Sequence, residues 1–175
     1  KIIQTSDNPY ITILGCYAQL KPNEIADING VNLVIGDKEK LNVANHVIEN
    51  YNKTNVQVIH KPISNSINFK SSFSMNDRVR SYLKIQDGCD YPCTYCTIPK
   101  ARGKSRHDNI KNILKNIKIL EKNNISEIVI TGVNIGDYGR ISKNETLFKL
   151  LSKINEFSSI NRFRISSIEP NLLTK

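Results

Sequence analysis

The stretch "RSYLKIQDGCDYPCTYC", residues 80–96, decides the fold because it joins a strand pattern directly to a crowded cysteine loop. Its first half, up to the glycine, predicts a β-strand. In its second half Cys89, Cys93 and Cys96 are separated by three residues and then by two. An odd number of thiols in one short loop leaves one sulfur over if two form a disulfide. The loop therefore indicates another use for its cysteines.

Beyond this stretch, helix and strand patterns alternate. Apolar residues recur at helical spacing over residues 110–120, and "SEIVITGVNIG", residues 126–136, predicts the next strand. Helical spacing returns over residues 147–154, and "RFRISSIEP", residues 162–170, predicts a third strand. Such alternation predicts an α/β fold with a parallel sheet. The run has fewer repeats than a TIM-like barrel needs, so we expect an internal piece of a longer protein.

The chain before residue 60 forms a separate α/β block. Residues 10–16 and 31–36 predict strands, and Pro22 opens a short helix between them. A longer helix follows, with apolar side chains on one face at Leu41, Ala44, Val47, Ile48 and Tyr51. Residues 61–77 are rich in Ser and Asn and lack periodicity. The predicted organisation is a domain over residues 1–60, a linker over 61–77 and a second domain over 78–175.

The net charge and the hydropathy of the chain limit the classes of function that it can have. Lys and Arg number 25 against 16 Asp and Glu, which gives a net charge of +9. This excess favours a polyanionic partner, either nucleic acid or an anionic membrane surface, although a compositional bias toward Lys would also produce it. No apolar run approaches the roughly 20 residues of a membrane span, and no signal peptide opens the chain. We expect a cytoplasmic protein without a membrane partner.

Several groups could use the three clustered cysteines. A structural zinc site needs four ligands. His107 is the other candidate ligand nearby, and together with the three cysteines it does not give a spacing that is usual for zinc ligands. A four-iron cubane held by three protein thiolates keeps one iron open for a small molecule. The cysteine spacing favours the cluster, and a structural metal or three unconnected thiols remain the alternatives.

The motif C-x3-C-x2-C, with the aromatic Tyr95 just before the last cysteine, resembles the signature of radical S-adenosylmethionine (SAM) enzymes. The resemblance implies a 4Fe-4S cluster on Cys89, Cys93 and Cys96, with the methionine end of SAM on the open iron. It also implies that Tyr95 packs beside the adenine of the cofactor. The signature follows a strand, where a barrel enzyme builds its active site.

The flanks are more specific, because "IQDGCDYPCTYCTIPKARG", residues 85–103, resembles the methylthiotransferases, which modify tRNA or a ribosomal protein. "GCYAQLKPNEI", residues 15–25, resembles the end of their N-terminal domain, which implies that Cys16 is a ligand of a second 4Fe-4S cluster. The alternative for Cys16 is a small buried structural thiol. "TGVNIGDYG" and "RISSIEPNLL" resemble the branch acting on N6-threonylcarbamoyladenosine beside the tRNA anticodon. The alternatives are isopentenyladenosine of tRNA, an aspartate of a ribosomal protein, or, outside the family, a zinc-binding nucleic-acid module.

The resemblance also sets expectations for the whole molecule. It implies the end of an N-terminal α/β methylthiotransferase domain, followed by the first half of a radical SAM barrel. The remaining ligands of the second cluster and an RNA-binding domain are expected outside this chain, so the piece alone should be inactive. The implied partners are the anticodon stem-loop of tRNA, an electron donor and a sulfur source, the last two unidentified.

Two further sets of residues have candidate roles. The resemblance implies cofactor contacts at the ends of two strands, and the alternatives there are an ordinary turn, a cap or a surface pair. These residues are Thr131, Gly132, Asn134, Ser166, Ser167 and Glu169. The segment "PKARGKSR" after the cysteine loop is either an RNA phosphate contact or a solvated loop. Its basic residues are Lys100, Arg102, Lys104 and Arg106.

Overall fold

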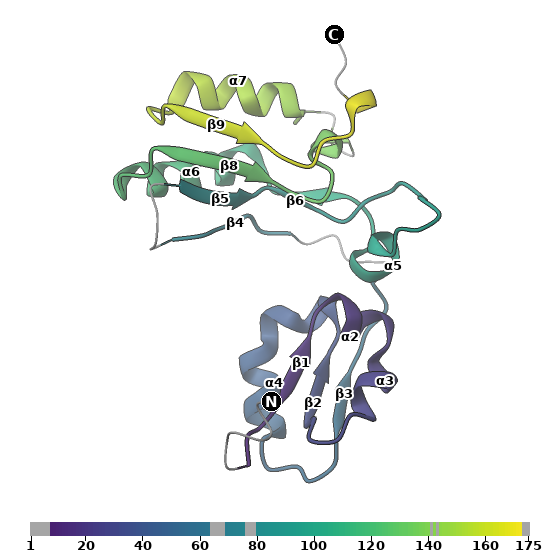
Figure 1. Cartoon of the computed structure of the whole chain (residues 1–175). Helices are drawn as coiled ribbons and strands as arrows, with labels where there is room; N and C mark the ends of the chain where they lie inside the picture. The colour runs from purple at the N-terminus through teal and green to yellow at the C-terminus, as the bar shows by residue number, and fades with distance from the viewer. Residues whose placement is uncertain (1–7, 64–68, 76–79, 141, 143, 173–175) are drawn as a thin grey trace. The chain divides into compact units, whose positions relative to one another are not determined.

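The computed structural model describes residues 8–63, 69–75, 80–140, 142 and 144–172 of the 175-residue chain. The chain divides into two compact units. The first unit comprises residues 1–66 and 92–103, and the second comprises residues 67–91 and 104–175. Each unit contains parallel strands together with helices (Figure 1), which confirms the predicted α/β class.

The first unit is built on a parallel sheet in the order β1-β2-β3. The strands are β1 (Thr12–Leu14), β2 (Leu33–Ile35) and β3 (Gln57–Ile59), and β2 is buried along its whole length. Pro22 opens α3 as predicted, since its fixed φ suits a first helical turn. The accompanying helices are α2 (Cys16–Leu20), α3 (Pro22–Ala26), η1 (Asp37–Asn42), α4 (Val43–Asn50) and α5 (Ile98–Arg102).

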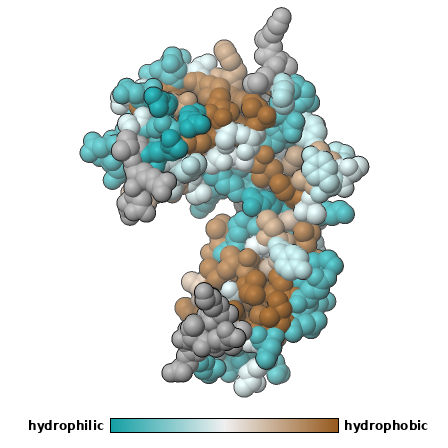
Figure 2. All heavy atoms as spheres, in the orientation of Figure 1, coloured by the Kyte–Doolittle hydropathy of each residue, from teal (hydrophilic) through white to brown (hydrophobic). Residues whose placement is uncertain are grey.

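The helix predicted from Leu41 onward forms in two parts, the end of the 3-10 helix η1, which contains Leu41, and α4, and much of the predicted apolar face is not buried. Leu41, Ile48 and Tyr51 are 84%, 76% and 62% exposed. The buried core of this unit lies instead around Ala18, Ile25, Val31 and Val34. Figure 2 shows hydrophobic residues on the surface of the first unit, over its strands. The apolar pattern thus locates the helix and does not identify what it packs against.

The second unit has a sheet in the order β4-β5-β8-β9. Its strands are β4 (Ser72–Phe73), β5 (Arg80–Lys84), β8 (Glu127–Thr131) and β9 (Arg162–Ile165). The pairs β5–β8 and β8–β9 are parallel, whereas β4 runs antiparallel to β5. Beyond β5, the short strand β6 (Gln86–Asp87) pairs with β7 (Arg106–His107), which brings the two arms of the cysteine loop together.

Two amphipathic helices, α6 (Ile110–Lys122) and α7 (Leu147–Phe157), supply the other half of this core. Side-chain caps begin both: Asn109 accepts a hydrogen bond from the backbone N–H of Asn112, and Thr146 from that of Lys149. Burial of each large apolar side chain contributes about 1.5–3 kcal/mol. The fully buried members are Leu83, Ile85, Ile113, Ile117, Leu120, Ile128, Ile130, Ile135 and Leu150.

The boundaries between the units differ from those predicted. Of the segment expected to be a linker, residues 64–68 and 76–77 lie outside the described residues. Residues 69–75 are described, and they contain β4, which pairs with β5 of the second unit. Residues 92–103, expected in the second domain, belong to the first unit. Within the described part of the chain, none of the helices combines the length and apolar character that crossing a bilayer requires.

Candidate functional site

The cysteine loop begins directly after β6, within the second unit. Gly88 has φ 72, a left-handed conformation that glycine adopts without strain, and the half-buried Cys89 follows it. Asp90 then accepts a hydrogen bond from the backbone N–H of Ser105 at 3.1 Å. The start of the loop is thereby fixed to the chain that returns after α5.

The other two cysteines of the motif lie in a turn that belongs to the first unit. The backbone N–H of Cys96 donates to the carbonyl of Cys93 at 3.1 Å, which closes the turn. Cys93 is exposed and Cys96 is half-buried. Between them the Tyr95 side chain is 90% exposed, so its ring is open to a stacking partner.

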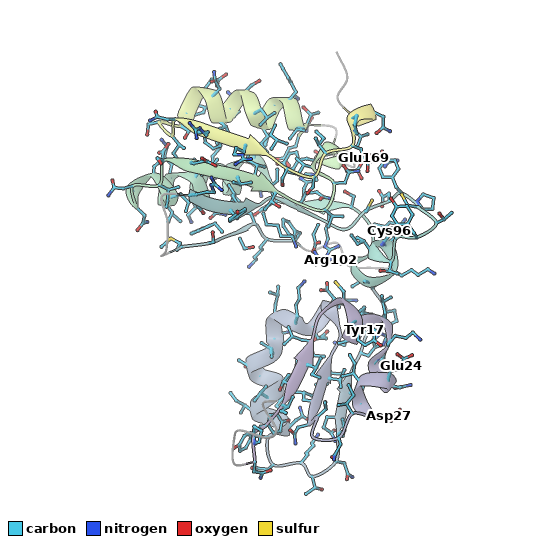
Figure 3. The ribbon with its side chains drawn as sticks, in the orientation of Figure 1. Tyr17, Glu24, Asp27, Cys96, Arg102 and Glu169 are labelled. Atoms are coloured by element: carbon cyan, nitrogen blue, oxygen red, sulfur yellow. The ribbon has the colours of Figure 1, made fainter. Side chains whose placement is uncertain are left out.

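Cys16 begins the helix α2, and α5 packs against this helix within the first unit. The Nε–H of Arg102, in the last turn of α5, donates to Cys16 Sγ at 3.2 Å. Gly103 then ends α5 with φ 79, and a Cβ there would lie 3.1 Å from the carbonyl oxygen of Ile63. Figure 3 marks Arg102 and Cys96 on this part of the chain. The first unit therefore holds Cys16 and the second half of the motif together.

The donor set fits an iron–sulfur cluster by its chemistry, because thiolates are the usual protein ligands of such clusters. Cys16, Cys93 and Cys96 are free thiols. Across the described residues, no three His, Cys, Asp or Glu side chains are gathered as a metal site. The ligand assignment therefore rests on thiol chemistry and spacing.

At the other proposed part of the site, the loops after β8 and β9 are bonded to each other. The backbone N–H of Ile135 donates to the carbonyl of Ser167 at 3.0 Å, and Glu169 N–H contacts Asn134 Oδ1 at 3.5 Å. Ser166 Oγ is bonded to the carbonyl of Ile130 at 3.2 Å. Asn134 and Ser166 thus support the loops. Thr131 is half-buried, and Ser167 and Glu169 are exposed; Figure 3 marks Glu169.

The basic segment separates into two pairs. Lys100 and Lys104 are exposed. Arg102 donates to Cys16, and Arg106 is only 5% exposed, with its guanidinium 3.1 Å from the Asp87 carboxylate. Because a buried guanidinium in an ion pair cannot serve as an accessible phosphate contact, the structure corrects the interpretation of Arg106. Its role is to support β6 and β7.

Sequence reasoning missed Gln86, which is fully buried at the base of the cysteine loop. It also missed the neighbouring Asp87, whose carboxylate is paired with Lys84 at 3.2 Å and with Arg106. The available signal was two polar residues placed between a strand and a glycine. Isolated buried polar groups need partners, so such a pair predicts a hydrogen-bonded junction.

Two buried carboxyl groups of the second unit have shifted pKa values of opposite sign. Burial raises the pKa of Asp137, just beyond β8, and the nearby Arg140 only partly offsets it. Burial also acts against the Asp108 carboxylate, but hydrogen bonds from Ser71, Asn112 and Asn109 outweigh it and lower the pKa of Asp108. Ser71 provides both its hydroxyl, at 2.5 Å, and its backbone N–H, at 2.8 Å. Asp108 thereby fastens the segment before β4 to the start of α6.

Comparison of the sequence with known proteins identifies the superfamily of the chain. The profile of the radical SAM superfamily matches residues 83–173, which include the end of β5, the cysteine motif, β8 and β9. The chain is 33% identical to the threonylcarbamoyladenosine tRNA methylthiotransferase MtaB of Bacillus subtilis, over 99% of this chain and 39% of that protein. It is 37% identical to the Thermotoga maritima protein of the same name, over 92% of this chain and 36% of the relative.

A related activity occurs among the relatives as well. The tRNA-2-methylthio-N(6)-dimethylallyladenosine synthase of Thermodesulfovibrio yellowstonii is 30% identical over 96% of this chain and 38% of its own length. The chain belongs to the radical SAM superfamily. Membership implies SAM and an iron–sulfur cluster as cofactors. The chain spans between 36% and 39% of the length of these relatives.

Proposed function

We propose that the protein to which this chain belongs transfers a methylthio group to N6-threonylcarbamoyladenosine beside the anticodon of tRNA. The observation that carries the proposal is the C-x3-C-x2-C loop after β6, inside the region that matches the radical SAM profile. The substrate is supported by relatives named for this nucleoside at 33% and 37% identity. The net charge of +9 suits a nucleic-acid partner.

Cys89, Cys93 and Cys96 hold a 4Fe-4S cluster in this proposal. When bound, the cluster supplies the electron that cleaves a carbon–sulfur bond of SAM. The chain's own contribution is position: Gly88 turns the backbone ahead of Cys89, and the hydrogen bond from Cys96 to Cys93 closes the turn that carries the other two thiolates. The protein thus binds and orients, while the redox chemistry belongs to the cofactors.

Cys16 is the ligand of a second cluster that serves sulfur insertion. Its support is the packing of α2 against α5, which places Cys16 in the same unit as Cys93 and Cys96. Arg102 donates to the Cys16 sulfur, as a hydrogen-bond donor beside a ligating sulfur would. The remaining ligands would come from parts of the protein beyond this chain.

The side chains proposed to contact the cofactor and the RNA are chosen by their exposure to solvent. Tyr95 offers an open ring for the adenine of SAM, and stacking on nucleic-acid bases is worth about 1–3 kcal/mol. Thr131, with Ser167 and Glu169 of the next loop, lines the ends of β8 and β9 where the rest of the cofactor would bind. Lys100 and Lys104 are the accessible cations for tRNA phosphates.

The test uses the full-length protein in cells whose own methylthiotransferase genes are deleted. Mass spectrometry of tRNA nucleosides should detect 2-methylthio-N6-threonylcarbamoyladenosine with the parent protein and none with Cys93→Ala. Purified Cys93→Ala should also yield no 5′-deoxyadenosine from SAM. Cys16→Ala should retain SAM cleavage and lose the modified nucleoside, because the radical cluster keeps its own three thiolates. Methylthiolated isopentenyladenosine as the product would instead assign the other tRNA branch.

A further inference from the structure

The side-chain amide of Gln86 joins three separate segments of the second unit. Gln86 is 0% exposed. Its Oε1 accepts hydrogen bonds from the backbone N–H groups of Val133 at 2.8 Å and Asn134 at 3.0 Å. Its Nε2 lies within hydrogen-bond distance of the carbonyl oxygens of Asp87 and Gly88, at 3.2 and 2.8 Å, and of Ser105 Oγ at 3.0 Å. Both lone pairs and both protons of the amide are therefore used.

These partners lie at the two arms of the cysteine loop and at the end of β8. Gly88 directly precedes Cys89, and Ser105 follows α5 where the chain returns from the loop. Val133 and Asn134 follow Gly132 in the turn after β8. One amide thus closes the base of the loop and, through its oxygen, fastens that base to the turn.

The neighbouring glycine shows how closely the two segments approach. A Cβ at Gly132 would lie 2.8 Å from Gln86 Oε1 and 3.1 Å from both the Cβ and the carbonyl oxygen of Gln86. Such distances are shorter than ordinary van der Waals contacts, so the turn reaches Gln86 only because residue 132 has no side chain. The contact is a built junction between the strand before the cysteines and the strand end proposed to meet SAM.

We propose that Gln86 is a positioning residue for SAM binding: it sets the backbone of Cys89 against the Gly132–Asn134 turn. The inference rests on the proposed function, which assigns Cys89 to the cluster and the turn to the cofactor. An amide is the side chain that suits this junction. A glutamate at position 86 keeps the two hydrogen bonds that Oε1 accepts from Val133 and Asn134, but it places its second oxygen against the carbonyl oxygens of Asp87 and Gly88. A leucine makes neither the accepted nor the donated hydrogen bonds.

The experiment compares Gln86→Glu and Gln86→Leu in the full-length, anaerobically reconstituted protein. Gln19→Glu is the matched control, because Gln19 is a buried glutamine of the first unit that bonds Asp37 N–H and the carbonyl of Lys61. The readouts are iron content, the dissociation constant of SAM, and the change that SAM causes in the electron paramagnetic resonance spectrum of the reduced cluster.

We expect both Gln86 variants to bind SAM about tenfold to a hundredfold more weakly and to show a reduced spectral response, the range found when outer-shell partners of metal ligands are removed. Iron content should fall less than in Cys93→Ala, since all three thiols remain. Gln19→Glu should bind SAM like the parent. Parental SAM affinity in both Gln86 variants overturns the proposal, as does an equal loss of affinity in Gln19→Glu.

Failure of the proposed function has a different signature. In that case the parent protein itself holds no oxygen-sensitive cluster and gives no spectral response to SAM. The metal-free protein still reports on the junction through amide hydrogen exchange. Val133 and Asn134 should be protected in the parent and in Gln86→Glu, which keeps the acceptor, and should exchange faster in Gln86→Leu. Parental exchange in Gln86→Leu means that the amide does not hold the turn, and this too overturns the inference.

Discussion

The two units place a buried glutamine over a glycine at the end of a parallel strand, and they use it differently. In the first unit Gln19, on α2, lies over Gly36 after β2; in the second, Gln86 lies over Gly132 after β8. Gln19 Oε1 accepts from Asp37 N–H at 2.9 Å, and its Nε2 lies 2.8 Å from His60 Nε2. Between them, Gln19 and Gln86 bond the loops that follow the parallel strands β2, β3 and β8, and α/β proteins build their sites at such strand ends.

The difference lies in what each glutamine holds. Gln19 joins a helix to the ends of β2 and β3, through the backbone of Asp37 and Lys61 and the side chain of His60. Gln86 contacts four backbone groups and one hydroxyl, and the chain it fixes leads directly into the first cysteine of the motif. The same amide chemistry therefore serves packing in one unit and, in our proposal, the geometry of a cofactor site in the other.

The largest expected difference between the units concerns their ion pairs. Arg106→Met removes the guanidinium from the 2%-exposed side chain of Asp87, which is also paired with Lys84. Breaking a buried pair costs about 3–5 kcal/mol, so urea denaturation should show a free energy of unfolding of the second unit lowered by about 3 kcal/mol. Lys21→Met, which removes the exposed Lys21–Glu24 pair of the first unit, should leave stability unchanged. Equal effects would mean that burial does not distinguish the two pairs.

The glycines test the comparison more directly. Gly132→Ala places a Cβ against the backbone oxygen and Cβ of Gln86, which cannot move aside alone, and should cost about 1–3 kcal/mol in unfolding free energy. At Gly36 the short contact, 2.6 Å, is with the terminal oxygen of Gln19. A side-chain end can rotate away, so Gly36→Ala should cost less. A larger loss at Gly36, measured by thermal and urea unfolding, would show that the first junction is the more rigid.

The smallest expected effect depends on pH. The lowered pKa of Asp108 contributes stability that is complete above the unfolded pKa, about 3.9, and is lost as the pH falls through the folded value. Ser71→Ala removes one hydrogen bond to the carboxylate and should cost about 1 kcal/mol at pH 7. The difference from the parent in urea unfolding should shrink as Asp108 becomes protonated. A constant difference from pH 7 to pH 3 would assign the effect to the Ser71–Asn116 contact instead.

The sequence predicts the elements of this molecule better than its junctions. Helical spacing located α6 and α7, and the strand patterns located β5, β8 and β9, because a continuous buried core imposes those periods. Ser72 and Phe73 of β4 carried no such signal, since a two-residue edge strand is too short for a period. Leu41 and Ile48 show the opposite situation. Their helical spacing is clear in the sequence, but both side chains are exposed, so the spacing does not reveal which surface they would pack against.

Within the candidate site, the cysteine spacing was the strong signal, because it is a local pattern and resembles the signature of the superfamily whose profile matches residues 83–173. The partners of Gln86, Asp87 and Arg106 come from segments up to 48 residues apart, and no local pattern records such a pairing. Arg102 looked like a surface charge by composition, although its Nε donates to a sulfur 86 residues earlier in the chain. Long-range polar contacts are therefore the feature of the candidate site that cannot be predicted from a single sequence.

The chain leaves the second unit at residue 91, adds α5 to the first unit, and returns at residue 104. This path has a consequence for the order of events during synthesis. Domains generally fold as units, beginning with the N-terminal one as the chain emerges from the ribosome. Here the first unit lacks the helix that packs on α2 until residue 103 has emerged, by which time β5 and β6 of the second unit have already emerged. The first unit is therefore completed only after part of the second has emerged, and the cysteine motif is divided between them, with Cys89 in the second unit and Cys93 and Cys96 in the first.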